Sequence, residues 1–139
     1  MEKYKFVFND REYELSEDNF DYLINDEEHP VEGIDESKIL ELLSQGEKID
    51  FDMECYGEPC TNCFAGKEEK AKYFKFLEYH FYIFSKQGQY VMSSISNEYE
   101  NTSFNKLLKR GKVDDSHIVS VIVCVNCGRY SIEIEQCEI

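Results

Sequence analysis

Two cysteine pairs constrain the fold of this chain more than any other feature of its sequence. Cys60 and Cys63 form one CxxC pair, and Cys124 and Cys127 form a second pair much later in the chain. A two-residue spacing lets both sulfurs of one turn face the same cation, and zinc takes four such ligands in a tetrahedron. Gly128 follows the second pair, where a left-handed residue completes a tight turn. The sequence therefore predicts a structural zinc site with Cys60, Cys63, Cys124 and Cys127 as its ligands.

The cysteines also allow a simpler interpretation, in which one or both pairs are free thiols in a reduced core. The remaining two cysteines are expected to be small buried side chains, since free cysteine usually behaves as a small hydrophobe. Cys55 falls on the apolar face of a predicted strand, and Cys137 lies near the last residue. We expect His80 and His117 to be structural residues rather than metal ligands.

Two enzyme hypotheses use only part of the cysteine set. Pro59 and the first pair resemble the P-C-x-x-C half of the zinc-dependent nucleobase deaminase signature, which also requires an H-x-E motif. The nearest histidine, His29, is followed by Glu32 at the wrong spacing, and the second pair would have no role. A redox dithiol is the other hypothesis, but reactive thiolates favour electropositive surroundings, and Glu54 and Glu58 lie close to the first pair. The sequence therefore favours a module over an enzyme.

The charge of the chain is concentrated in its first part. The formal net charge is −14; residues 1–58 hold 19 acidic and 5 basic side chains, whereas residues 59–139 are neutral. Such a surface repels a phosphate backbone, so we expect a protein partner rather than a nucleic acid. A local basic patch around Lys106, Lys109 and Lys112 keeps a nucleic-acid-binding zinc ribbon as an alternative. The length of 139 residues fits one domain, 1–139, with an acidic and a neutral half.

No segment of the sequence is typical of a membrane span or a signal peptide. Residues 118–125 form the longest apolar run, which is far shorter than the ~20 residues that a membrane helix needs. The first ten residues are charged and aromatic, without an apolar core region. We therefore expect a cytoplasmic protein without a membrane partner, in a compartment where thiols stay reduced.

Residue periodicity in the first half predicts one hairpin, two helices and one strand. Residues 4–8 and 12–15 flank Asn9-Asp10-Arg11, a sequence typical of a tight β-turn. Ser16 is expected to cap a short helix that includes residues 20–24, and Asp35 a second helix that ends at Gly46. Alternation of apolar and polar residues predicts a strand over 48–55.

Residues 67–95 allow two predictions. One prediction is a helix over 67–87, because four of its apolar residues recur at helical spacing: Phe74, Leu77, Phe81 and Phe84. The alternative is a strand that begins near Tyr79, turns at 86–88 and returns over 90–95, which the many aromatic residues also fit.

The last third of the chain predicts a helix followed by two strands. Asn101 or Thr102 would cap the helix, and Gly111 lies just beyond its end. Residues 118–125 are apolar on both faces, which is typical of a central strand, and residues 130–135 alternate. The sequence thus predicts a single α+β domain with antiparallel hairpins and three to four helices, in which zinc-ribbon-like turns join distant segments.

The cysteine turns at 59–63 and 125–128, together with Tyr13-Glu14-Leu15, resemble those of a small family of uncharacterised bacterial proteins of similar length. The resemblance implies a bacterial cytosolic origin and supplies no catalytic residue. Our leading expectation is a non-enzymatic, zinc-stabilised protein-interaction or regulatory module.

Overall fold

The computed structural model describes residues 3–46, 49–64 and 72–137, and these residues form a sheet-rich fold. Strands account for 44% of them and helical segments for 17%. The strands are β1 (Tyr4–Phe8), β2 (Arg11–Leu15), β3 (Phe20–Ile24), β4 (Asp52–Tyr56), β5 (Phe74–Lys86), β6 (Gln89–Ser93), β7 (Asp115–Cys124) and β8 (Tyr130–Gln136). The helices are α1 (Glu36–Gln45) and α2 (Phe104–Lys109), with 3-10 turns at Glu17–Asn19 and Asn97–Tyr99.

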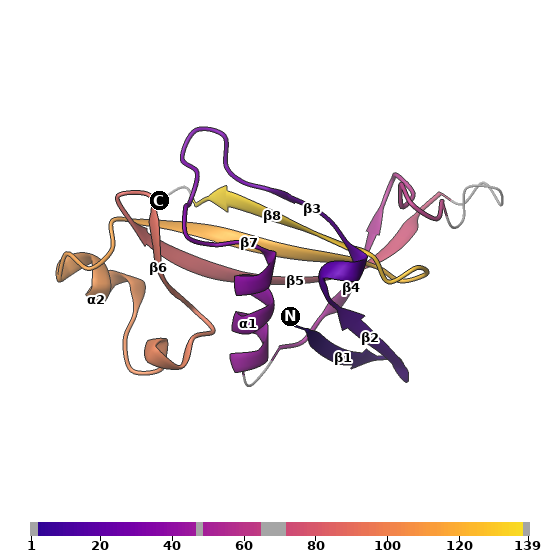
Figure 1. Cartoon of the computed structure of the whole chain (residues 1–139), viewed down its shortest axis with the longest axis horizontal. Helices are drawn as coiled ribbons and strands as arrows, with labels where there is room; N and C mark the ends of the chain where they lie inside the picture. The colour runs from indigo at the N-terminus through magenta and orange to yellow at the C-terminus, as the bar shows by residue number, and fades with distance from the viewer. Residues whose placement is uncertain (1–2, 47–48, 65–71, 138–139) are drawn as a thin grey trace.

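Six strands form one sheet, in the order β3-β8-β7-β5-β4, with β6 also paired to β5. All of these pairs are antiparallel except β3 with β8, which is parallel. The long strands β5, β7 and β8 lie side by side, and the separate β1–β2 hairpin lies with α1 next to them (Figure 1). Three of the six strand pairings, β3–β8, β4–β5 and β5–β7, therefore join segments that no short hairpin turn connects.

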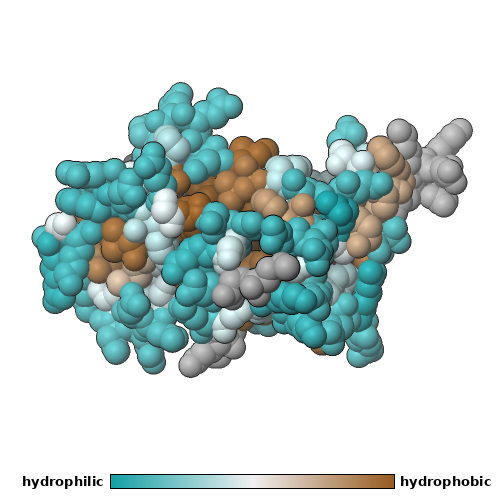
Figure 2. Space-filling view, in the orientation of Figure 1, coloured by the Kyte–Doolittle hydropathy of each residue, from teal (hydrophilic) through white to brown (hydrophobic). Residues whose placement is uncertain are grey.

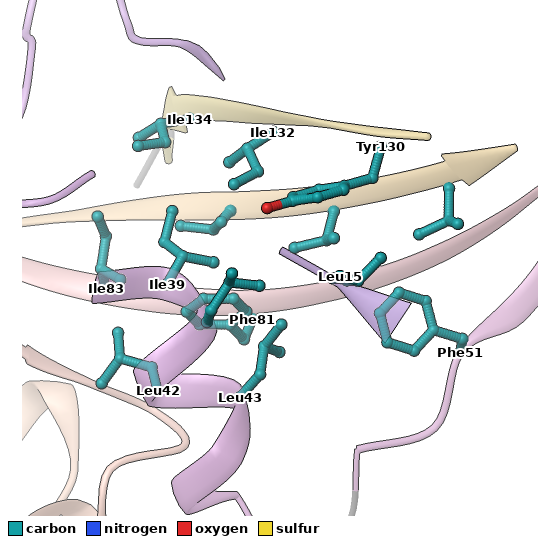
Figure 3. Packing of buried hydrophobic residues seen from close by; sticks show 14 of the residues in the cluster. Leu15, Ile39, Leu42, Leu43, Phe51, Phe81, Ile83, Tyr130, Ile132 and Ile134 are labelled. Atoms are coloured by element: carbon teal, nitrogen blue, oxygen red, sulfur yellow. The ribbon is translucent and has the colours of Figure 1, made fainter. Parts of the chain in front are cut away.

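One face of the sheet, which we call the inner face, carries the main hydrophobic core. Phe81 of β5 pairs with Val119 of β7, and Val119 pairs in turn with Ile134 of β8. Leu15 of β2 and Leu43 of α1 are fully buried against these strands (Figure 3). The helix and the hairpin thus cover the inner face, and both halves of the chain contribute to one core.

The opposite face of the sheet, which we call the outer face, is more polar. Because side chains alternate along a strand, Glu78 and His80 of β5 and Glu133 of β8 project from this face. Ile118 and Ile122 of β7 lie among them and are only half-buried. At one end of this face, a smaller cluster packs α2 against the sheet through Phe84, Leu107 and Val113.

The surface carries its hydrophobic residues in separate patches, and most of the side seen in Figure 2 is hydrophilic. Of the helices that the structure describes, none combines the length and the apolar character that a membrane crossing requires.

The prediction of an α+β fold with three to four helices is wrong, because the described residues contain only two α-helices. After Ser16, the expected helix is a single 3-10 turn, closed by a reciprocal pair of hydrogen bonds between Ser16 and Asn19. The chain then continues as β3, because Phe20 and Leu23 pair with β8 and contact the core. Tertiary pairing therefore overrides a weak local helix preference.

The predicted helix over 67–87 is also wrong within the described residues, and positions 67–71 lie outside them. Residues 74–86 form β5, which turns at Gln87 and Gly88, both with positive φ, into β6. The alternative hairpin is therefore confirmed, although its strand begins at Phe74 rather than near Tyr79. The apolar residues that suggested a helix lie on both faces of this strand: Leu77 and Phe81 on the inner face, Phe84 on the outer one.

Several other predicted elements are confirmed. The hairpin turns at Asn9 and Asp10, both with positive φ, and Asp35 accepts a hydrogen bond from the backbone N–H of Lys38 at the start of α1. The predicted strand over 48–55 is shorter, since β4 begins at Asp52, and residue 48 lies outside the described part. The third helix begins after Ser103 rather than after Asn101 or Thr102. Residues 118–124 of the apolar segment 118–125 belong to β7, which lies between β5 and β8 as expected of a central strand.

Core packing by α1 can be tested with two leucines on two helices. Leu43 is 0% exposed, whereas Leu108 of α2 is 41% exposed. We expect Leu43→Ala to lower the free energy of unfolding by about 3 kcal/mol, because it removes buried methyl groups and leaves a cavity. Leu108→Ala should lower it by less than about 1 kcal/mol. Urea unfolding measures both values, and equal losses would contradict the assignment of α1 to the core.

Candidate metal centre

The two cysteine pairs lie in turns that have the same backbone geometry. In the first turn, the backbone N–H of Phe64 donates to the carbonyl of Cys60 at 2.9 Å; in the second, the N–H of Gly128 donates to the carbonyl of Cys124 at 3.0 Å. Both donor residues are left-handed, with φ of 50° and 77°. The left-handed residue predicted at Gly128 is therefore confirmed, and Phe64 adopts a similar conformation despite its side chain.

The two turns meet, so the four predicted ligands form one cluster. Cys60 Sγ lies 3.7 Å from Cys127 Sγ, and Cys63 Sγ lies 3.7 Å from Cys124 Sγ. All four sulfurs lie within 4.8 Å of one another. Four thiolates placed tetrahedrally around zinc, each about 2.3 Å from it, are about 3.8 Å apart. The donor set and its spacing therefore fit a tetrahedral metal ion.

The fold brings the turns together at one end of the long strands (Figure 1). Cys124 is the last residue of β7, and Cys127 lies in the turn that leads into β8. Cys60 and Cys63 lie in the segment that follows β4. Since β4 and β7 both pair with β5, the segment after β4 starts close to the end of β7.

Burial disfavours the ionisation of the two thiols of the second turn. It raises the pKa of Cys124 above its ordinary value and that of Cys127 to about 12. Backbone N–H groups partly oppose this effect, because those of Asn126 and Cys127 face the Cys124 sulfur and that of Arg129 faces the Cys127 sulfur. A cation at the centre would favour the thiolates that burial otherwise disfavours.

Asp21 of β3 ties the two turns together outside the sulfur cluster. Its carboxylate accepts a hydrogen bond from Asn62 Nδ2 in the first turn and another from Arg129 Nε just after the second turn. The same contact with Arg129 is an ion pair, and the Asp21 side chain is only 18% exposed. Asp21 therefore fixes the position of one turn relative to the other.

The β1–β2 hairpin and the residues after it hold the second turn by its carbonyl groups. Arg11 donates to the carbonyls of Val125 and Asn126, and the Tyr13 hydroxyl donates to the carbonyl of Val125. Asn19 Nδ2 donates to the carbonyl of Gly128 at 2.9 Å. These contacts orient the backbone whose N–H groups face the sulfurs.

Sequence reasoning missed Asp21, Arg11, Tyr13 and Asn19 as residues of this centre. The segment Asn9-Asp10-Arg11 indicated only a turn. Each of the four residues reaches a cysteine turn through a hydrogen bond between residues more than forty positions apart in the sequence. No local pattern carries that information.

The other candidate residues lie away from the sulfur cluster. Cys55 is exposed, so its predicted burial is wrong. In β4, Cys55 pairs with Lys75 of β5, and this part of the sheet lies beyond the core. Cys137 lies just after β8 and is only half-buried, which differs from the buried side chain that was predicted. His80 is exposed on the outer face, between Ser120 and Glu78.

The histidine of the deaminase hypothesis, His29, is not brought to the cysteines. His117 is buried, and its Nε2 donates to the backbone carbonyl of His29 at 2.7 Å. His117 lies near the start of β7, whereas Cys124 is at its end. His29 therefore lies at the opposite end of the strand from the sulfur cluster.

Gly128 provides a test of the turn geometry. A Cβ at Gly128 would meet nothing within 4 Å, so the cost of Gly128→Ala comes only from the left-handed backbone. We expect a loss of about 1 kcal/mol in unfolding free energy. Gly57→Ala is the matched control, because its Cβ also meets nothing within 4 Å and its φ lies outside the left-handed range. Urea unfolding of both variants measures the difference, and equal effects would contradict the turn geometry.

Comparison with known proteins gives one match. No curated protein and no solved structure shows significant similarity to the chain. A family model described as "Protein of unknown function (DUF3785)" matches residues 4–139, nearly the whole chain. The resemblance noted from the cysteine turns is thereby confirmed. The chain belongs to the DUF3785 family, whose function is unknown.

Proposed function

We propose that the chain is a non-enzymatic protein-interaction or regulatory module whose fold is held by one structural zinc ion. Cys60, Cys63, Cys124 and Cys127 would be its ligands. The observation that carries this proposal is the convergence of their four sulfur atoms within 4.8 Å of one another. Zinc would supply a cross-link between the segment after β4 and the β7–β8 turn.

The donor set favours a structural role over a catalytic one. Four thiolates fill the tetrahedral shell of zinc and leave no position for water or substrate. Arg11 and Asn19 bind backbone carbonyls of the second turn, and Asp21 binds the Asn62 side chain of the first; such surrounding hydrogen bonds are expected of a rigid site. Redox chemistry is less well supported, because a thiol with a raised pKa, such as Cys127, is a poor nucleophile.

A protein partner fits the charge of the chain better than a nucleic acid does. The net charge of −14 opposes phosphate. The basic residues Lys106 and Lys109 lie in the last turn of α2, where positive charge complements the helix dipole and needs no ligand to explain it. A reducing compartment such as the cytosol would keep the four thiols available for the metal.

Metal content and stability test the proposal together. Elemental analysis with native mass spectrometry should give one zinc ion per chain and would identify iron in its place. Removal of the metal by a chelator should lower the melting temperature strongly or unfold the chain, because a structural zinc site contributes on the order of 10 kcal/mol to folding. A folded chain that never carries metal, or an unchanged melting temperature after its removal, would contradict the proposal.

Two serine variants separate the metal ligands from the other cysteines. We expect Cys127→Ser to lower the unfolding free energy by at least about 4 kcal/mol, since it removes one ligand of a structural site. Cys55→Ser is the matched control, because Cys55 is exposed and lies outside the cluster. Its effect should stay within about 0.5 kcal/mol. Loss of metal from both variants, or from neither, would argue against the assigned ligands.

A further inference from the structure

A groove of about 260 Å³ crosses the outer face of the sheet beside the sulfur cluster. Phe76 of β5 and Ile122 of β7 lie on the sheet beneath it, and Tyr56 and Tyr22 line it from β4 and β3. The segment 58–61, which includes Cys60, forms another part of its lining. The groove therefore spans the sheet from β4 to β3, a distance of about 19 Å at the usual strand spacing.

The groove is negatively charged. Asp21, Glu58 and Glu133 line it, and Arg129 is the one Lys or Arg among its lining residues. Arg129 already forms an ion pair with Asp21. Within the described part of the chain, neither Glu58 nor Glu133 has a Lys or Arg partner within 4.0 Å. Among the described residues, two carboxylates of the groove thus have no Lys or Arg partner.

Neighbouring outer-face residues strengthen the negative potential. Glu78 pairs across the strands with Ile122, a lining residue, and Glu54 pairs with Phe76. Burial raises the pKa of Glu78, and the nearby charges of Glu54 and Glu133 raise it further, against the opposing effect of His80. Carboxylates crowded in this way favour a cationic ligand.

The aromatic residues of the groove suit a flat cation. Tyr56 and Phe76 contact edge to face, with ring centroids 5.1 Å apart, and Tyr22 is 48% exposed at the other end. A guanidinium group stacks on aromatic rings and binds carboxylates with two parallel hydrogen bonds, which an ammonium group does not do. The lining therefore matches an arginine side chain more closely than a lysine.

We propose that this groove is the docking site for an arginine-containing segment of a partner protein, with Glu58 and Glu133 binding the guanidinium. The assignment rests on the proposed function, because it names the partner chemistry of the interaction module. It also gives the metal centre a further role. Cys60 and Cys124 both line the groove, so the cross-link that joins them sets the position of the 58–61 wall above the sheet.

Charge complementarity selects this occupant over the alternatives. A nucleic acid would bring phosphates against Glu58, Glu133 and Glu78. A second copy of the chain, docked by the same face, would bring the same carboxylates against each other. A cationic segment is the partner that neutralises them.

The test uses the full-length, metal-loaded chain and three synthetic peptides. The first is an extended peptide that alternates arginine and valine, the second replaces arginine with lysine, and the third replaces it with the neutral isostere citrulline. Nuclear magnetic resonance titration with 15N-labelled protein locates each peptide. We expect the arginine peptide to shift the amides of Tyr22, Tyr56, Ile122 and Glu133, and the citrulline peptide to bind at least about tenfold more weakly.

Two double variants make the test specific to the groove. Glu58→Gln with Glu133→Gln should weaken arginine-peptide binding at least about tenfold. Glu98→Gln with Glu100→Gln is the matched control, since it makes the same charge change at two exposed residues that do not line the groove. Equal binding by the two double variants, equal binding of the citrulline or lysine peptide, or amide shifts confined to other surfaces would overturn the proposal. So would a native mass spectrum showing that the chain forms a dimer through this face.

Metal analysis of the same samples distinguishes a failure of the groove assignment from a failure of the proposed metal-stabilised module. A chain that carries zinc, melts as expected on chelation and still binds no arginine peptide would refute the groove assignment alone. A folded chain without metal would refute the proposed metal-stabilised module, whichever peptide it bound. Melting temperatures of both double variants should match that of the parent chain, because the substituted residues lie outside the core.

Discussion

The meeting of four sulfur atoms is the interaction on which this end of the molecule depends. The main core is formed by the inner face of the sheet, α1 and the first hairpin, and the first cysteine turn lies outside it. The segment after β4 therefore depends on contacts outside the main core to hold it near the β7–β8 turn. The sulfur cluster and the bridge from Asn62 through Asp21 to Arg129 take over that task. A cross-link between distant segments stabilises a fold mainly by restricting the unfolded chain.

The first hairpin connects this centre to the core. Phe6 stacks on Phe51 with ring centroids 4.1 Å apart, and Leu15 is fully buried. On the same face of the hairpin, nearer its turn, Arg11 and Tyr13 hold the carbonyls of the second cysteine turn. The same five-residue strand thus packs the core and orients the backbone around the sulfurs. The position of the second cysteine turn and that of the hairpin are therefore coupled through these hydrogen bonds.

Local signals predicted only part of the fold. Turn chemistry at Asn9-Asp10 and the cap at Asp35 located the hairpin and α1, because both depend on residues close in sequence. Segments 20–24 and 74–86 were mistaken for helices, since their apolar residues also fit a helical period. Their strand state comes from pairing with β8 and β7, which are distant in sequence. A period of apolar residues does not distinguish a helix from a strand whose two faces both contact apolar groups.

In the candidate site, too, local sequence predicted some residues and only the tertiary fold brings in the others. The spacing of the cysteines alone indicated which four residues would meet, since two CxxC turns are complementary by chemistry. The residues that support them were invisible to that argument, because Asp21, Arg11 and Asn19 reach the turns only through the tertiary fold. Burial of Cys55 was inferred from alternation along β4, but alternation gives the direction of a side chain and not whether anything covers it.

The distribution of charge over the fold differs from its distribution along the chain. The first half holds the net charge of −14, yet Glu78 and Glu133 of the neutral half lie on the outer face together with Glu54 of the acidic half. The sheet thus collects carboxylates from three strands on one face. Ile118 and Ile122 lie among them on the central strand and are only half-buried. Glu78 is paired with His80, whereas Glu54 and Glu133 have no Lys or Arg within 4.0 Å among the described residues. Apolar and anionic side chains that share one face would complement a segment with apolar and cationic side chains, which is the occupant proposed for the groove.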